Sequence, residues 1–191
     1  MKLILASGSP RRHDLLAQMG LRFEVQVPNV PEIIPENATP EEVVTALALQ
    51  KAEAVQHTNP DDCIIGADTI VYLDGDILGK PDDGQMARAY LRRLQGRSHQ
   101  VFTGVAVLTP GRRDVRVCVT EVTFAPMSQA EIDWYVGTGE PMDKAGAYGV
   151  QGPGGVFVTE IRGNYFNVMG LPISMVYNML QGIQQLITNS E

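Results

Sequence analysis

Near its N-terminus the chain reads Leu3-Ile4-Leu5-Ala6-Ser7-Gly8-Ser9-Pro10-Arg11-Arg12, which predicts a buried strand, a small-residue turn and the start of a helix. Ser9 suits the N-cap and Pro10 the first helical position, and Gly20 is typical of a helix end. Such a turn presents backbone N–H groups beside the positive end of the helix dipole. Two arginines in the first helical turn oppose that dipole. The turn is therefore either an anion-binding site or a capped helix with solvated arginines.

Length and charge narrow the classes of protein that this chain can represent. Its 191 residues predict one domain over 1–191, with room for two lobes. A net charge of −7 argues against binding to nucleic acid or to an anionic membrane, because both require a basic surface. We find no long apolar span and no signal peptide, so a cytoplasmic location is expected. Cys63 and Cys118 are isolated in sequence, which predicts reduced, buried thiols.

Strand and helix patterns alternate along the chain. Strands are expected over 3–6, 22–27, 63–67, 99–108, 114–124 and 156–158, and helices over 10–19, 40–57, 85–94, 129–137 and from 172 onward. Thr39 and Ser128 each precede a glutamate by three residues, the pattern of a capping box. A slip of alternation near Glu121 predicts a bulge. The two long middle strands are close enough to form a hairpin, so we expect an α/β fold with a mixed sheet.

The last helix is expected to bury one apolar stripe. Its members, which recur at helical spacing, are Ile173, Val176, Tyr177, Leu180, Ile183 and Ile187.

Asp68 is the second informative position, because it is expected just beyond the end of a buried strand, where open α/β sheets place their ligands. An aspartate there could equally terminate a turn. Further charged residues fall in loops, beside predicted helices or, for Lys51, within the predicted helix over 40–57; they are Glu32, Lys51, Lys80, Asp143 and Lys144. Each of them taken alone is typical of a solvated surface residue. Their spacing does not establish whether they converge.

Five blocks of sequence, in order along the chain, resemble the Maf family of septum-formation-inhibitor-like nucleoside triphosphate pyrophosphatases. They are the 7–12 hexapeptide, Gly66-Ala67-Asp68-Thr69, Gly79-Lys80-Pro81, Asp143-Lys144-Ala145-Gly146-Ala147-Tyr148-Gly149 with Gln151-Gly152, and Gly163 through Gly170-Leu171-Pro172. The resemblance covers the chain from Leu3 to about Leu186. In one departure, Pro31 precedes Glu32 where many members have an acidic residue, so a second carboxylate is not expected in that loop.

The resemblance implies a mixed-sheet fold with two lobes and a cleft, similar to the inosine-triphosphate pyrophosphatase fold. It also implies hydrolysis of a nucleoside triphosphate between its α- and β-phosphates, with a divalent metal, Mg²⁺ being expected and Mn²⁺ an alternative. Phosphate-binding candidates are Ser7, Ser9, Arg11, Arg12, Lys51 and Lys80, since a triphosphate needs cations and N–H donors. Glu32 and Asp68 are the metal candidates, because Mg²⁺ prefers oxygen ligands. Asp68 is also the expected base for the attacking water.

Within the family, Arg12, Thr69 and Gln151 resemble the subgroup that acts on dTTP and UTP. The Gln151 amide can both donate and accept, which matches the imide edge of thymine or uracil, although it could instead stabilise its loop. A 7-methyl-GTP pyrophosphatase and a nucleotide-sensing regulator of septum formation with little turnover are the alternatives. The expected partner is the nucleoside triphosphate, and the resemblance leaves a homodimer open.

Overall fold

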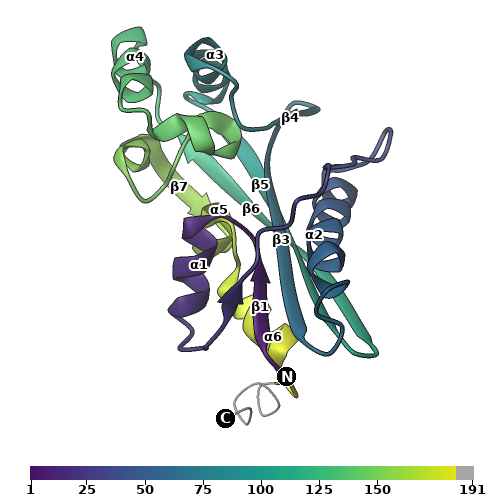
Figure 1. Cartoon of the computed structure of the whole chain (residues 1–191). Coiled ribbons are helices and arrows are strands. Elements are labelled where there is room, and N and C mark those ends of the chain that lie inside the picture. Colours follow the sequence, from purple (N-terminus) through teal and green to yellow (C-terminus); the bar gives the residue numbers. More distant parts are fainter. Residues whose placement is uncertain (184–191) are drawn as a thin grey trace. The chain divides into compact units, whose positions relative to one another are not determined.

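The computed structural model describes residues 1–183 and has an α/β architecture around a mixed sheet (Figure 1), as predicted. The strand order is β2-β1-β3-β5-β6-β7, with β4 paired to β3. The β1 strand is parallel to β2 and β3, whereas the β3–β4 and β6–β7 pairs are antiparallel. The strands are β1 (Leu3–Ala6), β2 (Glu24–Val25), β3 (Cys63–Leu73), β4 (Asp76–Leu78), β5 (Ser98–Thr109), β6 (Arg112–Phe124) and β7 (Val158–Arg162).

The chain divides into two compact units. Unit 1 contains Met1–Asp68, Thr103–Cys118 and the chain from Gly170 on, and unit 2 contains Thr69–Phe102 and Val119–Met169. Strands β3, β5 and β6 each contribute residues to both units. The prediction of one domain over 1–191 stays a prediction. Within residues 1–183, no helix combines the length and apolar character that crossing a membrane requires.

Unit 1 carries helices α1 (Pro10–Ala17), α2 (Pro40–Gln56) and α6 (Ile173–Leu180). The predicted capping box at the start of α2 is present, since Thr39 accepts from the Glu42 N–H and the Glu42 carboxylate accepts from the Thr39 N–H. The apolar face of α2 is buried against the sheet, in a cluster with Ile4, Ile64 and Ala106. This cluster packs α2 on the strands of unit 1.

Two glycines let α2 lie directly against the strands of unit 1 (Figure 1). A Cβ atom built on Gly66 in β3 would lie 2.3 Å from the Ala48 carbonyl oxygen and 2.8 Å from the Ala52 nitrogen. One built on Gly104 in β5 would lie 2.3 Å from the Val44 carbonyl oxygen. Real Cβ atoms do not approach backbone this closely, so a larger residue at either position would force the helix away from the sheet.

Unit 2 packs α3 (Gly84–Leu94) and α4 (Gln129–Gly137) together over its own core. The second predicted capping box, Ser128 with Glu131, is present at the start of α4. Short helices follow in the glycine-rich part of the chain: η1 (Glu140–Asp143), η2 (Ala145–Ala147), η3 (Pro153–Phe157) and α5 (Tyr165–Met169). Buried aromatic side chains from three elements and a loop, including Phe124, Tyr135, Tyr148 and Phe157, fill this core.

Several predicted boundaries are wrong. The strand expected over 22–27 is reduced to β2, and residues 156–157 belong to η3 because Pro153-Gly154-Gly155 starts a 3₁₀ turn. The irregularity expected near Glu121 lies between Thr123 and Phe124, where the pairing of β6 with β7 shifts register. Tyr177 is 47% exposed, and Met179 fills the buried face of α6 instead. Ile187 lies outside the described residues.

A buried histidine in unit 2 predicts acid sensitivity. His99 is 3% exposed, its Nε2 lies 2.8 Å from the Tyr148 hydroxyl, and its Nδ1 has no hydrogen-bond partner within residues 1–183. Burial lowers the pKa of His99 from 6.5 to about 4. Between these pH values the unfolded chain binds more protons, so the free energy of unfolding falls as the pH is lowered. We expect a loss of about 2 kcal/mol between pH 7 and pH 5.

Chemical denaturation over this pH range, with a His99→Gln variant, would measure the effect. The variant is expected to lose that part of the pH dependence, whereas His13→Gln and His57→Gln, at exposed positions, keep it. An identical pH dependence in His99→Gln and the unmodified protein would contradict the assignment.

Candidate active site

Lys51 joins two carboxylates that lie far apart in the sequence. Its Nζ, on α2, lies 2.8 Å from Glu32 Oε1 and 2.5 Å from Asp68 Oδ1. The Lys51 and Asp68 side chains are 15% and 12% exposed, whereas Glu32 is 55% exposed. The ammonium group therefore neutralises one nearly buried carboxylate and one carboxylate that faces solvent. All three residues belong to unit 1.

The sequence predicted that Asp68 follows the end of a strand. In the structure, Asp68 instead lies within β3. The strand continues because Ile70, Val71 and Leu73 extend its apolar pattern to the turn at Asp74-Gly75. Its partner β1 does end, and the last pair is Ala6 with Gly66. Asp68 is thus two residues further along β3 than Gly66, the last residue that pairs with β1. It shares a face of β3 with Gly66, at which α2 makes its close approach.

Arg12 occupies the predicted turn at the start of α1. Its Nε donates to the Gly170 carbonyl at 2.8 Å, and its Nη1 donates to Ser7 Oγ at 3.3 Å. Burial lowers the pKa of Arg12, while the negative charges of Asp68 and Glu32 act in the opposite direction. Arg12 is therefore within electrostatic range of both carboxylates. The positive charge of Arg11 adds to the lowering of that pKa.

The turn itself differs from the predicted cap. The Ser9 side chain makes no capping hydrogen bond to α1, although Ser9 does precede the helix and Pro10 is its first residue. Instead, Ser7 Oγ accepts from the Ser9 N–H at 3.2 Å and from Arg12. Ser7, 6% exposed, therefore connects the turn to the first arginine-bearing turn of the helix.

Lys80, Thr69 and Gln151 belong to unit 2. Lys80 is exposed and follows Gly79, whose carbonyl accepts from the Gly146 N–H at 3.1 Å. Thr69 is the half-buried residue after Asp68 in β3, where successive side chains point to opposite faces. The convergence of these three residues with Arg12 and Lys51 stays a prediction.

The loop that carries Gln151 is held at both sides of that residue. The Tyr135 hydroxyl oxygen accepts from the Gly149 N–H at 3.0 Å, and Glu140 Oε2 accepts from the Gly154 N–H at 2.9 Å. A Cβ on Gly152 would lie 1.9 Å from Glu140 Oε1. The Gln151 side chain is exposed while its backbone is anchored from α4 and η1. This combination suits a side chain that contacts a ligand.

Glu32 and Asp68 can accommodate a divalent metal that needs only one or two protein carboxylates. Among residues 1–183, no group of three or more His, Cys, Asp and Glu side chains is arranged to hold a metal. Glu32 and Asp68, however, already share one cation, the Lys51 ammonium group. Mg²⁺ keeps several waters and binds proteins through one or two carboxylates plus substrate phosphates. The two carboxylates fit such an ion and do not form a closed protein cage.

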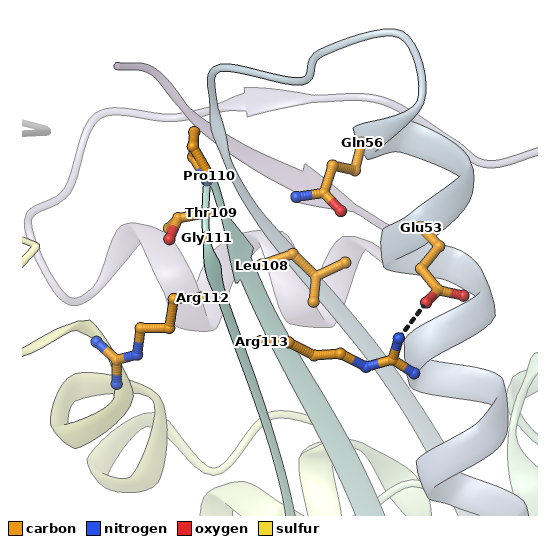
Figure 2. A pocket seen from close by; sticks show the side chains of 8 residues that line it. All are labelled: Glu53, Gln56, Leu108, Thr109, Pro110, Gly111, Arg112 and Arg113. Atoms are coloured by element: carbon orange, nitrogen blue, oxygen red, sulfur yellow. Dashed lines mark hydrogen bonds and ion pairs between the residues drawn. The ribbon is translucent and has the colours of Figure 1, made fainter.

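A separate pocket of about 320 Å³ lies in unit 1 between the end of α2 and the turn that joins β5 to β6 (Figure 2). Arg113 points across it to Glu53, at 2.8 Å, whereas Arg112 points away and pairs with Asp114. None of the predicted site residues lines it. The pocket is therefore distinct from the Lys51 cluster, and both of its arginines are neutralised by acidic neighbours.

Sequence reasoning missed Gln50 as a contact of the Glu32 loop and Gly170 as the acceptor for Arg12. Gly170 lies in one of the blocks that carry the family resemblance, which is a signal for it. Gln50 had no signal beyond its position next to Lys51.

Comparison with known proteins shows the family to which the chain belongs. The chain is 51% identical over 179 residues to a protein of Symbiobacterium thermophilum named dTTP/UTP pyrophosphatase, covering 94% of this chain and 92% of that protein. It is 49% identical over 180 residues to a protein of the same name from Bacillus pumilus, covering 94% and 95%. The Staphylococcus aureus Ham1 structure superposes with a TM-score of 0.48 at 17% identity, covering 65% of this chain and 72% of that one. Residues 2–183 match the family described as Maf-like protein, and the chain belongs to that family.

Proposed function

We propose that this protein hydrolyses dTTP and UTP to the nucleoside monophosphate and pyrophosphate. The observation that carries the proposal is the cluster of Lys51 with Glu32 and Asp68. A site that only bound a polyanion would gain nothing from two carboxylates, whereas a site for a metal–triphosphate complex needs them. The names of the two relatives support the choice of dTTP and UTP.

Cationic groups and N–H donors are proposed to hold the triphosphate. Arg11, Arg12 and Lys51 would neutralise its charge from unit 1, with Ser7 and Ser9 in the turn that precedes α1. Lys80 would add a cation from unit 2. Arginine suits this role because its planar fork binds two phosphate oxygens at once.

Glu32 and Asp68 are proposed to hold the divalent metal, Mg²⁺ or Mn²⁺, which when bound would neutralise charge on the phosphates. Asp68 is also proposed as the base. Water attacks the α-phosphorus, its proton passes to an Asp68 carboxylate oxygen, the bond from the α-phosphorus to the bridging oxygen breaks, and pyrophosphate leaves. Lys51 would exchange its carboxylate partners for phosphate oxygens when the substrate arrives.

A panel of nucleoside triphosphates, assayed for pyrophosphate release with and without Mg²⁺, tests the proposal. We expect dTTP and UTP to be hydrolysed fastest and the reaction to stop when the metal is chelated. Preferential hydrolysis of 7-methyl-GTP would overturn the proposed substrates but not the reaction. Nucleotide binding without turnover would favour the regulatory alternative. Size measurement in solution would decide between a monomer and a homodimer, and the cytoplasmic location stays a prediction.

Base selection is proposed to depend on Gln151, with Thr69 and Arg12 shaping the pocket. Gln151→Glu replaces an amide that donates and accepts with a group that only accepts at neutral pH. The variant is expected to lower kcat/KM for dTTP and UTP by about 10- to 100-fold, because a donor to the base is lost. Gln100→Glu, the same change at an exposed position of unit 2, is expected to leave kcat/KM unaltered. Equal kcat/KM values for the two variants would contradict the role.

A further inference from the structure

Two consecutive residues of α2 hold two consecutive residues of the loop that precedes it. Lys51 Nζ contacts the Glu32 carboxylate at 2.8 Å. The Gln50 side-chain amide binds both backbone groups of Ile33: its Oε1 accepts from the Ile33 N–H at 3.0 Å, and its Nε2 donates to the Ile33 carbonyl at 2.6 Å. Glu32 and Ile33 are thus attached to the same turn of the same helix.

Burial does not hold this loop in place. Within residues 26–38, which lie between β2 and the N-cap of α2, the structure contains no helix or strand. Glu32 and Ile33 are 55% and 65% exposed. An exposed segment gains little from burial to offset the entropy of ordering, so Glu32 needs specific anchors to keep one position.

The helix that supplies the anchors packs closely on the sheet. Leu47 and Ala48 on α2 are buried, and the Ala48 carbonyl lies against β3 at Gly66. Asp68 is on that same strand. The Gln50 amide therefore attaches the Glu32 loop to a helix that packs directly on β3, the strand that carries the other carboxylate.

We propose that Gln50 is a positioning residue that keeps Glu32 in place for the divalent metal; the inference rests on the proposed function. The contact with Lys51 would not serve this purpose throughout the reaction, because Lys51 is proposed to leave Glu32 for a phosphate oxygen when the substrate binds. The Gln50 contact is to the Ile33 backbone and does not involve the Glu32 carboxylate. Gln50 thus holds the loop whether Lys51 is paired with Glu32 or with a phosphate.

The first measurement is of the contact itself. Gln50→Met keeps an unbranched side chain and a good helix former but removes both hydrogen bonds to Ile33. Amide hydrogen exchange of Ile33 is expected to become about 10-fold faster, because one hydrogen bond contributes about that factor. Gln56→Met, the same change on the same helix away from the loop, is the control and is expected to leave exchange at Ile33 unaltered.

The second measurement is of the metal. With a non-hydrolysable dTTP analogue, Mn²⁺ binding followed by electron paramagnetic resonance is expected to weaken by about 3- to 10-fold in Gln50→Met. The Mg²⁺ concentration for half-maximal turnover should rise by the same factor, with kcat at saturating Mg²⁺ largely retained. In a Glu32→Gln background, Gln50→Met should add no further change. Gln50→Glu, which keeps the acceptor for the Ile33 N–H, should recover part of the exchange protection.

The outcomes distinguish a positioning role of Gln50 from a purely structural one. Faster exchange at Ile33 with unaltered Mn²⁺ binding would overturn the proposal and leave Gln50 a structural contact of the loop. Unaltered exchange would overturn the contact. Absence of turnover by the unmodified protein with every triphosphate would instead refute the proposed function, a result that the exchange measurement does not depend on.

Discussion

Replacing Asp68 by asparagine is expected to lower turnover of dTTP and UTP by about two to four orders of magnitude, as is typical when a general base is removed. The amide has the shape of the carboxylate and can still accept from Lys51, but it cannot take the proton of the attacking water. The substitution also removes one of the two negative charges that are proposed to hold the metal. Initial rates of pyrophosphate release at saturating Mg²⁺, together with thermal unfolding, would measure both effects.

Asp61→Asn provides the matched control, since Asp61 is an exposed aspartate of unit 1. It is expected to have the activity of the unmodified protein. If Asp68→Asn retained more than about a tenth of the normal rate with its fold intact, Asp68 would not be the base.

Gly66→Ala is expected to destabilise unit 1 by about 3 kcal/mol, at the upper end of the usual range for overpacking. The added Cβ would meet backbone atoms of α2, 2.3 Å from the Ala48 carbonyl oxygen and 2.8 Å from the Ala52 nitrogen. Backbone cannot rotate away as a side chain does, so the helix must shift. Because Lys51 is on that helix, the shift would also move its ammonium group from Asp68 and reduce turnover.

Urea denaturation and the assay of pyrophosphate release would measure the two consequences. Gly137→Ala is the control, because a Cβ there meets nothing within 4 Å. It should be as stable as the unmodified protein or slightly more stable. Equal stability of Gly66→Ala and Gly137→Ala would mean that the close contact between α2 and β3 does not limit what position 66 can hold.

Local signals in the sequence predicted much of the fold. Both capping boxes are present, and α2 begins at Pro40 and ends one residue before the predicted His57. Capping and turn preferences depend on residues three or four positions apart, which a sequence displays directly. The extent of β3 was wrong because the polar pair Asp68-Thr69 resembles a strand end, whereas pairing with other strands carries β3 on to Leu73.

By itself, the sequence determined most of the longer elements, the mixed-sheet class and the candidate residues, because periodicity, caps and family motifs are encoded locally. Only the tertiary structure decided that Glu32, Lys51 and Asp68 meet, since contacts across 17 residues or more depend on how α2 packs on β3. That packing is possible because Gly66 and Gly104 have no side chain, and no local sequence pattern identifies this role. The hold of Gln50 on Ile33 likewise exists only once the loop folds back on the helix, because both partners of the hydrogen bonds are brought together by the fold.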